Sequence, residues 1–245
     1  MSVDPGISEA AADLSALLAH TLPLDSPAMQ QASLSPIATL KSASGDAPLA
    51  VFCCNDSVAL QASSARFIRG QYWATHQATL TSLMYRRFAL LDGCDMPCAV
   101  VGIKPFESSQ ALVERYLDEP IQQLVSQVLG RHIPRESLIE VGNLAADSLI
   151  QSVRLIIFLL HWLNRVGISH AVCTGTEAVR LALKRARVPF QVIGAADPNR
   201  LGDERLRWGS YYQNAPQILL IDIEQGLAAV SSRYQVDLMK LEAQR

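Results

Sequence analysis

The stretch Ile139-Glu140-Val141-Gly142-Asn143-Leu144-Ala145-Ala146-Asp147 carries more information about this chain than any other. Its first residues are typical of a buried strand, and its last residues are typical of the start of a helix. A carboxylate, a glycine and a carboxamide stand where a buried strand normally has Val, Ile or Leu. Because unpaired polar groups inside a sheet cost free energy, Glu140 and Asn143 need a structural partner or a chemical task.

Length and composition indicate one large globular domain, or one domain with an appendage. The chain has 245 residues, of which 49% are hydrophobic and 18% are charged. The net charge of -2 gives no electrostatic reason to expect nucleic acid as a partner. The most apolar run, residues 155–160, lies between Arg154 and His161 and is too short to cross a bilayer, so we expect no membrane span.

The five cysteines do not follow the pattern of a disulfide scaffold. Their number is odd, which favours a reducing compartment, and the N-terminus does not resemble a secretory signal. We therefore expect a cytoplasmic protein. Cys94 and Cys98 have no second Cys/His pair at zinc-ligand spacing, so we expect no metal.

The texture of the sequence changes near residue 48. Residues 1–48 are rich in Ala, Ser and Pro, and we interpret them as a partly flexible N-terminal extension. Within it the pattern of residues 8–20 suits a short amphipathic helix, and a solvated tail is favoured over a lid that folds over a binding site. Residues 49–228 form the expected αβ domain, and residues 229–245 form a C-terminal tail.

Hydrophobic periodicity and turn signals predict a mixed α/β fold. The expected strands are 49–54, 86–91, 98–104, 138–145, 168–174, 190–195 and 217–223. The expected helices are 56–76, 109–117, 120–129, 148–165 and 177–186. The strand–helix–strand order from residue 138 favours parallel pairing of strands 138–145 and 168–174.

Two readings remain open for each polar residue of the central strand. Glu140 is either a general base for an amine, directly or through water, or a structural partner of Arg86, Arg87 or Arg135. Asn143 either orients a carbonyl group or satisfies the backbone at the strand end. Side chains 140 and 143 face opposite sides of a regular strand, so a shared site requires a bulge at Gly142, which would also splay the strand from its neighbour.

Two further segments carry candidate site residues. In Trp208-Gly209-Ser210-Tyr211-Tyr212, either tyrosine can protonate a leaving thiolate, and a packed aromatic corner is the alternative. In Cys173-Thr174-Gly175-Thr176, backbone amides at a helix start can hold phosphate, whereas a plain turn with Thr176 as helix cap is the alternative. No nucleotide-binding glycine motif occurs in the chain.

Four segments together resemble the bacterial thermostable hemolysin family, and they occur in the family's order. They are Arg115-Tyr116-Leu117-Asp118-Glu119-Pro120-Ile121, Glu140-Val141-Gly142-Asn143-Leu144-Ala145, Thr174-Gly175-Thr176 and Trp208-Gly209-Ser210-Tyr211-Tyr212. The resemblance covers roughly residues 50–228. It implies a GNAT-like fold, in which helices flank a central twisted mixed sheet, similar to N-acyltransferases and to acyl-homoserine-lactone synthases. In such folds the fourth strand carries the acyl-thioester site and splays from the fifth; here these are 138–145 and 168–174.

One segment departs from the acetyltransferase pattern. Acetyltransferases follow this strand with a glycine-rich loop that holds the coenzyme A pyrophosphate, whereas residues 145–150 contain no glycine and include Asp147. We therefore expect an acyl donor bound to the phosphopantetheine of an acyl carrier protein, with coenzyme A as the alternative donor. No other cofactor is expected.

The resemblance implies an acyltransferase that acts on the amine of an amino acid or another small metabolite, in specialised-metabolite biosynthesis. Glu140 is then the base, Asn143 positions a substrate, and Tyr211 or Tyr212 protonates the departing thiol. Substrate contacts are expected from Arg86, Arg87, Trp208, Thr174 and Thr176, where the arginines bind a carboxylate or the acidic surface of the carrier. The alternatives are a non-catalytic binding or regulatory protein, and a membrane-active hemolysin.

Overall fold

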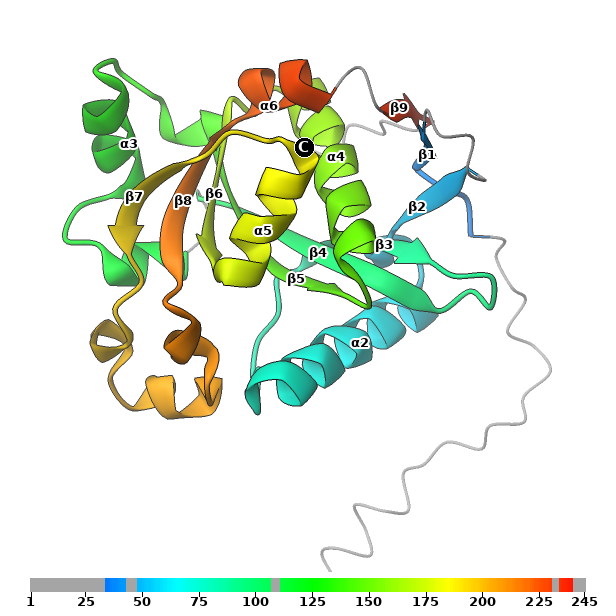
Figure 1. Cartoon of the computed structure of the whole chain (residues 1–245), viewed down its shortest axis with the longest axis horizontal. Coiled ribbons are helices and arrows are strands. Elements are labelled where there is room, and N and C mark those ends of the chain that lie inside the picture. The colour runs from blue at the N-terminus through cyan, green and yellow to red at the C-terminus, as the bar shows by residue number, and fades with distance from the viewer. Residues whose placement is uncertain (1–33, 43–47, 107–110, 231–233, 240–245) are drawn as a thin grey trace, which may run out of the picture. The chain divides into compact units, whose positions relative to one another are not determined.

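The computed structural model describes residues 34–42, 48–106, 111–230 and 234–239. Within them a single mixed sheet has the strand order β7-β8-β6-β5-β4-β3-β2-β1-β9 (Figure 1). The strands are β1 Ala38–Ser42, β2 Leu49–Cys53, β3 Arg86–Leu91, β4 Pro97–Pro105, β5 Leu138–Ala146, β6 His170–Gly175, β7 Gln191–Ala195, β8 Gln217–Asp222 and β9 Tyr234–Leu238. The α/β prediction with a mixed sheet is confirmed.

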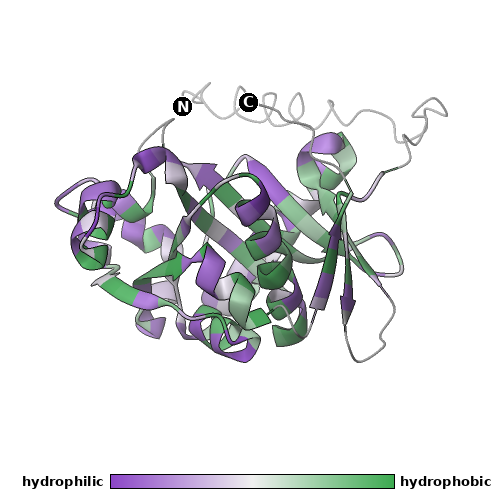
Figure 2. Cartoon of the chain, turned by 90° about the horizontal axis from the view of Figure 1, so that it is seen from above, coloured by the Kyte–Doolittle hydropathy of each residue, from purple (hydrophilic) through white to green (hydrophobic). Residues whose placement is uncertain are grey.

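Helices cover both faces of this sheet. They are α2 Val58–His76, α3 Ile121–Leu129, α4 Leu149–Arg165, α5 Glu177–Ala186 and α6 Ile223–Val230. Helices α4, α5 and α6 pack on one face, where Leu155 and Phe158 are fully buried. Helix α3 and helix α2 each build a separate core on the other face, around Val125 and Ile68 respectively. Coloured by hydropathy, the apolar residues gather where the helices meet the strands (Figure 2).

Strand pairing follows the prediction at the centre of the sheet. Strands β5 and β6 are parallel, and α4 connects them, as the order of elements predicts. Ser148 accepts the Gln151 N–H and so caps α4, while Gly167, with φ of 81°, follows its end. The other pairs are antiparallel, and β8 lies between β6 and β7.

The sheet extends beyond both boundaries that we drew at residues 48 and 229. Strand β1 belongs to the segment interpreted as an extension, and it pairs with both β2 and β9. Strand β9 and part of α6 belong to the segment interpreted as a tail. The predicted helix at 8–20 lies outside the described residues. The predicted helix 109–117 is wrong over residues 111–117, which hold only the short 3-10 helix η2, Val113–Tyr116.

A bulge interrupts β5 one residue later than predicted. Gly142 pairs with Gly102 and Ala145 with Val100, so that two residues of β5, Asn143 and Leu144, face one residue of β4. Asn143 takes the left-handed conformation, with φ of 51°. The Met84 side chain packs over Gly142, where a Cβ would lie 2.6 Å from the Met84 Cε atom and would displace the end of that flexible side chain.

The bulge coincides with the separation of β5 from β6. Their pairing runs from Leu138 with His170 to Val141 with Cys173 and ends there, although both strands continue. The predicted splay of the two strands is therefore present. No described helix is both long and apolar enough to cross a bilayer.

Candidate active site

A cavity of about 220 Å³ opens where β5 and β6 separate. One part of its wall is apolar and comes from the core between the sheet and helices α4 and α5. That part includes Val141, Ile156, Leu159, Leu160, Leu163, Val179, Ala182, Leu183, Val188 and Ile221. The other part is polar or aromatic and comes from α2, β5, β6 and the 3-10 helix η5, Tyr211–Asn214. It includes Gln71, Tyr72, Thr75, His76, Asn143, Cys173, Thr174, Thr176 and Tyr211.

Two of the family-like segments hold each other together beside this cavity. The η4 helix, Pro198–Trp208, and η5 follow β7, and they meet the segment after residue 111. Arg115 pairs with Glu204, Asp118 with Arg200, and the Tyr116 and Tyr212 hydroxyls lie 2.6 Å apart. The segment 115–121 therefore supports the aromatic connection 198–214.

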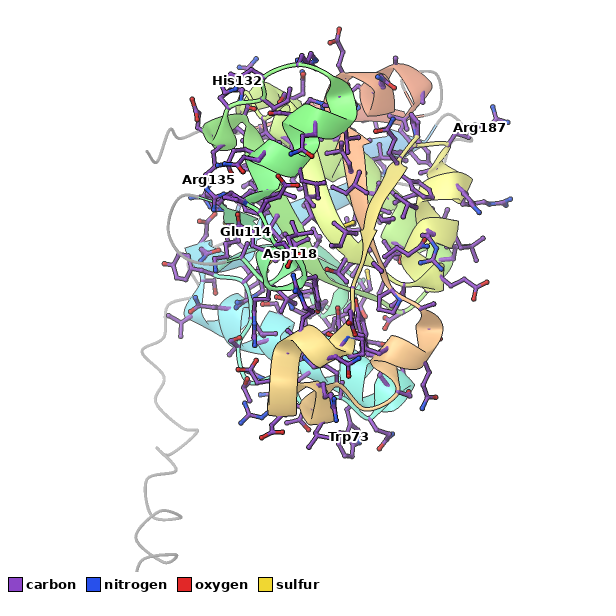
Figure 3. All side chains as sticks on the ribbon, turned by 90° about the vertical axis from the view of Figure 1, so that its left-hand side faces the viewer. Trp73, Glu114, Asp118, His132, Arg135 and Arg187 are labelled. Carbon is purple, nitrogen blue, oxygen red and sulfur yellow. The ribbon has the colours of Figure 1, made fainter. Side chains whose placement is uncertain are left out.

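A half-buried ion pair stabilises this supporting segment. Arg135 bonds both oxygens of Glu114, the Phe106 carbonyl and Gln122. The Arg135 guanidinium lowers the pKa of Glu114. Figure 3 shows Glu114, Arg135 and Asp118 along one side of the molecule. One of our two interpretations paired Arg135 with Glu140. The structure instead pairs Arg135 with Glu114.

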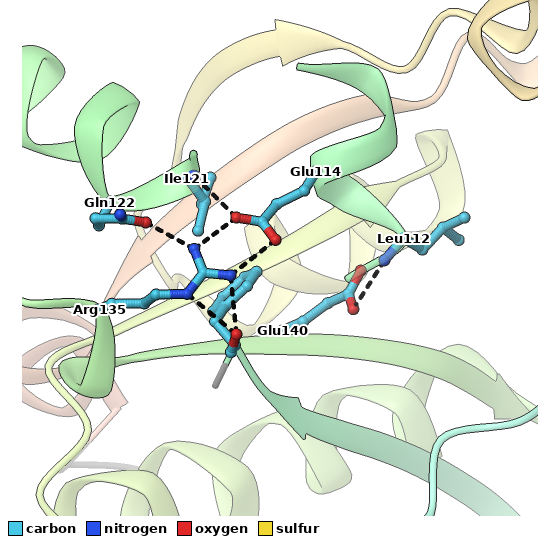
Figure 4. Close-up of polar contacts among 7 residues, drawn as sticks. Leu112, Glu114, Ile121, Gln122, Arg135 and Glu140 are labelled. Atoms are coloured by element: carbon cyan, nitrogen blue, oxygen red, sulfur yellow. Dashed lines mark hydrogen bonds and ion pairs between the residues drawn. The ribbon is translucent and has the colours of Figure 1, made fainter. Parts of the chain in front are cut away.

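Glu140 is buried and its carboxylate holds backbone amides. Its two oxygens accept the N–H groups of Leu112 and Val113, at 3.2 and 2.8 Å. Figure 4 shows the bond from Leu112. Burial raises the pKa of Glu140, and these two hydrogen bonds act in the opposite direction. Glu140 is not among the residues that line the cavity. Its observed partners therefore support a structural role, although the partners are amides and not the arginines we considered.

Asn143 lies at the cavity wall and holds a neighbouring loop. Its Oδ1 atom accepts the Met84 N–H at 2.7 Å. Met84 also packs against Gly142, and Gly142 lies on the same face of the extended strand as Glu140. Because the Asn143 side chain reaches Met84 as well, the bulge turns Asn143 toward the face of the strand that carries Glu140. It does not produce a joint site, because only Asn143 of the two lines the cavity.

The aromatic segment forms part of the cavity wall through one residue. Tyr211 is buried, lines the cavity and donates its hydroxyl hydrogen to the Thr174 carbonyl at 3.2 Å. Tyr212 is half-buried and bonded to Tyr116, outside the lining. Trp208 packs against both tyrosines and against Tyr72. Of these candidates, the structure brings only Tyr211 to the cavity.

The two predicted arginines lie elsewhere. Arg87 is buried and donates to Ser64 and to the carbonyls of Met84 and Gln61, which is a structural arrangement. The Arg86 guanidinium lies over the Trp162 ring, 5.9 Å from its centre. Neither side chain lines the cavity.

Thr174 and Thr176 both line the cavity, next to the buried Cys173. The Thr174 Oγ1 atom is buried and has no hydrogen-bond partner among the described residues, so it is available to a bound molecule. Thr176 occupies the predicted N-cap position just before α5, with an extended backbone, but its side chain makes no capping bond. Burial raises the pKa of Cys173 to about 12, so its thiol stays protonated.

Two residues of α2 that we did not predict complete the polar part of the cavity. Tyr72 and His76 are one helical turn apart, at the end of α2, and both line the cavity. His76 lies 5.2 Å from the Tyr211 ring, measured between ring centres. Their spacing of four residues was visible in the sequence, but nothing local to α2 indicates that Tyr211, 135 positions later, packs against it.

The start of α4 differs from a pyrophosphate-binding loop. Ser148 caps the helix, and Asp147 accepts a hydrogen bond from Gln71 of α2 at 3.0 Å. A carboxylate at this helix start repels a phosphate group, which the backbone amides of the helix start could otherwise bind. The described residues contain no group of His, Cys, Asp and Glu side chains suited to a metal ion.

Comparison with known proteins supports the fold. FeeM, an N-acyl amino acid synthase from uncultured soil microbes, is 13% identical with a TM-score of 0.50 over 80% of this chain and 95% of its own. The acyl-homoserine-lactone synthase LasI is 9% identical with a TM-score of 0.52 over 85% of this chain and 100% of its own. A search of curated proteins by sequence finds no match.

At these identities the two structures establish the fold alone, and it is the GNAT-like fold of the acyltransferases. The model of the thermostable hemolysin family matches residues 55–227, which is more than half of the 245 residues. The chain therefore belongs to the thermostable hemolysin family.

Proposed function

We propose that this protein is an N-acyltransferase that moves an acyl group from a thioester to the amine of an amino acid or another small metabolite. The observation that carries the proposal is the cavity at the splay of β5 and β6, apolar on one side and polar on the other. An acyl thioester has the same division, with an alkyl chain at one end and a reactive carbonyl at the other.

The apolar part of the cavity suits the alkyl chain. It is lined by Leu159, Leu163 and Leu183, which are buried in the core between α4, α5 and the sheet. Burying a methylene group of the chain there gains about 0.8 kcal/mol. We therefore propose an acyl chain of several carbons as the transferred group.

The polar part suits the thioester carbonyl and the leaving group. Tyr211 and Tyr72 hold their protons, because burial raises the pKa of Tyr211 well above its ordinary value and that of Tyr72 to about 12. Tyr72 can donate a hydrogen bond to a developing oxyanion or thiolate, and Tyr211 can do so once its hydroxyl turns away from the Thr174 carbonyl. Asn143 and Thr174 add polar atoms to the same part of the wall.

We propose an acyl carrier protein as the donor, with coenzyme A as the alternative. Asp147 at the start of α4 disfavours a pyrophosphate group there. The sequence of α2 contains no Asp or Glu, and its exposed side carries Arg66, Arg69 and Trp73. Trp73 points away from the protein (Figure 3). A basic surface with an exposed aromatic ring fits an acidic carrier, and the opposite side of α2 lines the cavity.

A charge reversal separates the two donors. In Arg66→Glu/Arg69→Glu, we expect kcat/KM to fall at least about tenfold with an acyl carrier protein, through the lost charge attraction, and to change little with the matching acyl coenzyme A. Arg185→Glu, on the exposed side of α5, is the control. An equal loss with both donors would contradict docking of the carrier on α2.

The reaction itself is tested by mass spectrometry. Acyl carrier proteins and acyl coenzyme A of several chain lengths are incubated with the protein and with a pool of amino acids and of amines that lack a carboxylate. We expect loss of the acyl group from one donor and appearance of a matching amide. Thioesters that remain intact with every amine would contradict the proposal and would favour a non-catalytic binding role.

The five cysteines, all free, suit the cytoplasm, where we propose that the reaction occurs.

A further inference from the structure

His76 is held in place by a segment far from it in sequence. It is the last residue of α2, and its carbonyl oxygen accepts the Ser210 N–H at 2.8 Å and the Ser210 hydroxyl at 3.3 Å. Its ring contacts those of Tyr72 and Tyr211, with centres 6.1 and 5.2 Å away, and these two tyrosine rings also contact each other. Figure 1 shows the turns of residues 198–214, in orange, beside this end of α2.

Gly209 makes this close approach possible. It has φ of 53°, and a Cβ atom on it would lie 2.0 Å from the His76 carbonyl oxygen. Any other residue would displace the end of α2 or the connection 198–214. The Trp-Gly-Ser-Tyr-Tyr segment therefore positions His76 at the cavity wall as well as supplying Tyr211.

His76 differs in protonation from the other titratable groups of the wall. Among the described residues that line the cavity, these groups are Tyr72, His76, Cys173 and Tyr211. Burial raises the pKa of Tyr72, Cys173 and Tyr211, which stay protonated, whereas burial lowers the pKa of His76. His76 is therefore the member of this set with a free lone pair at neutral pH.

We propose that His76 is the general base of the acyl transfer, a role that rests on the proposed function and that we had expected from Glu140. Two observations exclude Glu140 from the cavity in this structure: its absence from the wall and the engagement of both its oxygens by backbone amides. His76 lines the cavity and is half-buried. Its ring contacts the rings of Tyr72 and Tyr211, which belong to the polar part of the wall.

The proton balance closes with His76 alone. The neutral amine attacks the thioester carbon and forms the C–N bond, and the His76 imidazole takes the proton that the nitrogen must lose. The C–S bond then breaks with its electron pair on sulfur. The imidazolium gives the proton to the thiolate, so that an amide and a free thiol leave and His76 is neutral again.

Asn214 contacts one ring nitrogen of His76. Its carboxamide nitrogen donates to the Ser210 carbonyl at 3.3 Å and lies 3.5 Å from His76 Nδ1. Because a carboxamide nitrogen only donates, this contact suits the tautomer with the lone pair on Nδ1 and the proton on Nε2. The titratable groups that face the ring among the described residues are the phenols of Tyr72 and Tyr211, both neutral.

The test compares three glutamine variants in the amide-forming assay. For His76→Gln we expect kcat to fall about 10²–10⁴-fold, with recovery on addition of imidazole, and with loss of the acidic limb of the pH–rate profile. His161→Gln is the control, because His161 is also half-buried with a lowered pKa but lies outside the cavity wall. Glu140→Gln should keep the acidic limb.

A second variant guards against misfolding of His76→Gln. In Asn214→Asp, a carboxylate beside Nδ1 raises the pKa of His76, so the acidic limb should move to higher pH while the protein stays folded. An unchanged limb there, or a His76→Gln protein with wild-type kcat and profile, would overturn the role of His76 while amide formation still stands. If wild type forms no amide with any donor, the proposed function fails instead.

Discussion

At the scale of single residues, the polar positions of β5 explain both what the sequence predicts and what it does not. Glu140 and Asn143 do need partners, as their place in a buried strand requires, and both have them. The partners are backbone amides of Leu112, Val113 and Met84, which no sequence pattern identifies. A carboxylate in a buried strand therefore predicts a hydrogen-bond partner. Its chemical role depends on whether its face of the strand lines a cavity, which the rest of the chain determines.

Glu140 makes a pH-dependent prediction. Its pKa is raised, so the folded chain binds this proton more tightly than the unfolded chain, and its contribution is complete below the ordinary pKa of a glutamate. That contribution is lost as the pH rises through the raised pKa. The free energy of unfolding of wild type should thus fall relative to Glu140→Gln across this range, in urea titrations at several pH values. A constant difference would contradict the burial of this carboxyl.

Gly209 predicts a loss of stability with a matched control. Gly209→Ala meets both an unfavourable backbone conformation and the His76 carbonyl, so we expect a loss of about 3 kcal/mol and lower activity. Gly202 has a similar φ of 56° but open space around it, so Gly202→Ala should lose only the conformational part, about 1–2 kcal/mol. Equal losses in urea titrations would show that the contact with α2 is unimportant.

At the scale of elements, the segments with strong local signals are predicted and those with weak signals are not. Strands β3, β4, β5 and β6 are rich in apolar residues and lie close to their predicted bounds. Strand β1, with the sequence Ala-Thr-Leu-Lys-Ser, is short and polar at one end, and it exists because β2 and β9 flank it. Such a strand follows from tertiary pairing and cannot be recognised from its own composition.

The ion pair of Glu114 with Arg135 predicts a large cost at one position and a small cost at another. Arg135→Gln removes bonds to Glu114, Phe106 and Gln122, so we expect a loss of about 2–3 kcal/mol. Arg200→Gln breaks a pair with the exposed Asp118 and should cost less than about 1 kcal/mol.

Measurements at low pH separate the contribution of this ion pair to the free energy of unfolding from the contribution of packing. Since the pKa of Glu114 is lowered, the contribution of the pair is complete above the ordinary pKa of a glutamate and is lost as the pH falls through the lowered value. The difference between wild type and Arg135→Gln should therefore shrink in acid. A difference that persists there would assign the effect to lost packing.

At the scale of the whole molecule, the position of β1 predicts where the chain can be shortened. Ala38 and Leu40 are almost fully buried between β2 and β9. A chain that begins at residue 48 should melt at least about 5 °C below one that begins at residue 34, as followed by circular dichroism. Equal melting temperatures would show that β1 adds nothing to the sheet.

The chain-length preference of amide formation tests whether the cavity holds the acyl chain, with product and free thiol quantified together by mass spectrometry. Ala182→Leu narrows the apolar wall of the cavity, whereas Leu181→Ala changes the exposed side of the same helix and serves as control. We predict one thiol for each amide, and a shift toward shorter acyl chains in Ala182→Leu alone. An unchanged preference, or no amide at all, would contradict the claim that this cavity holds the acyl group being transferred.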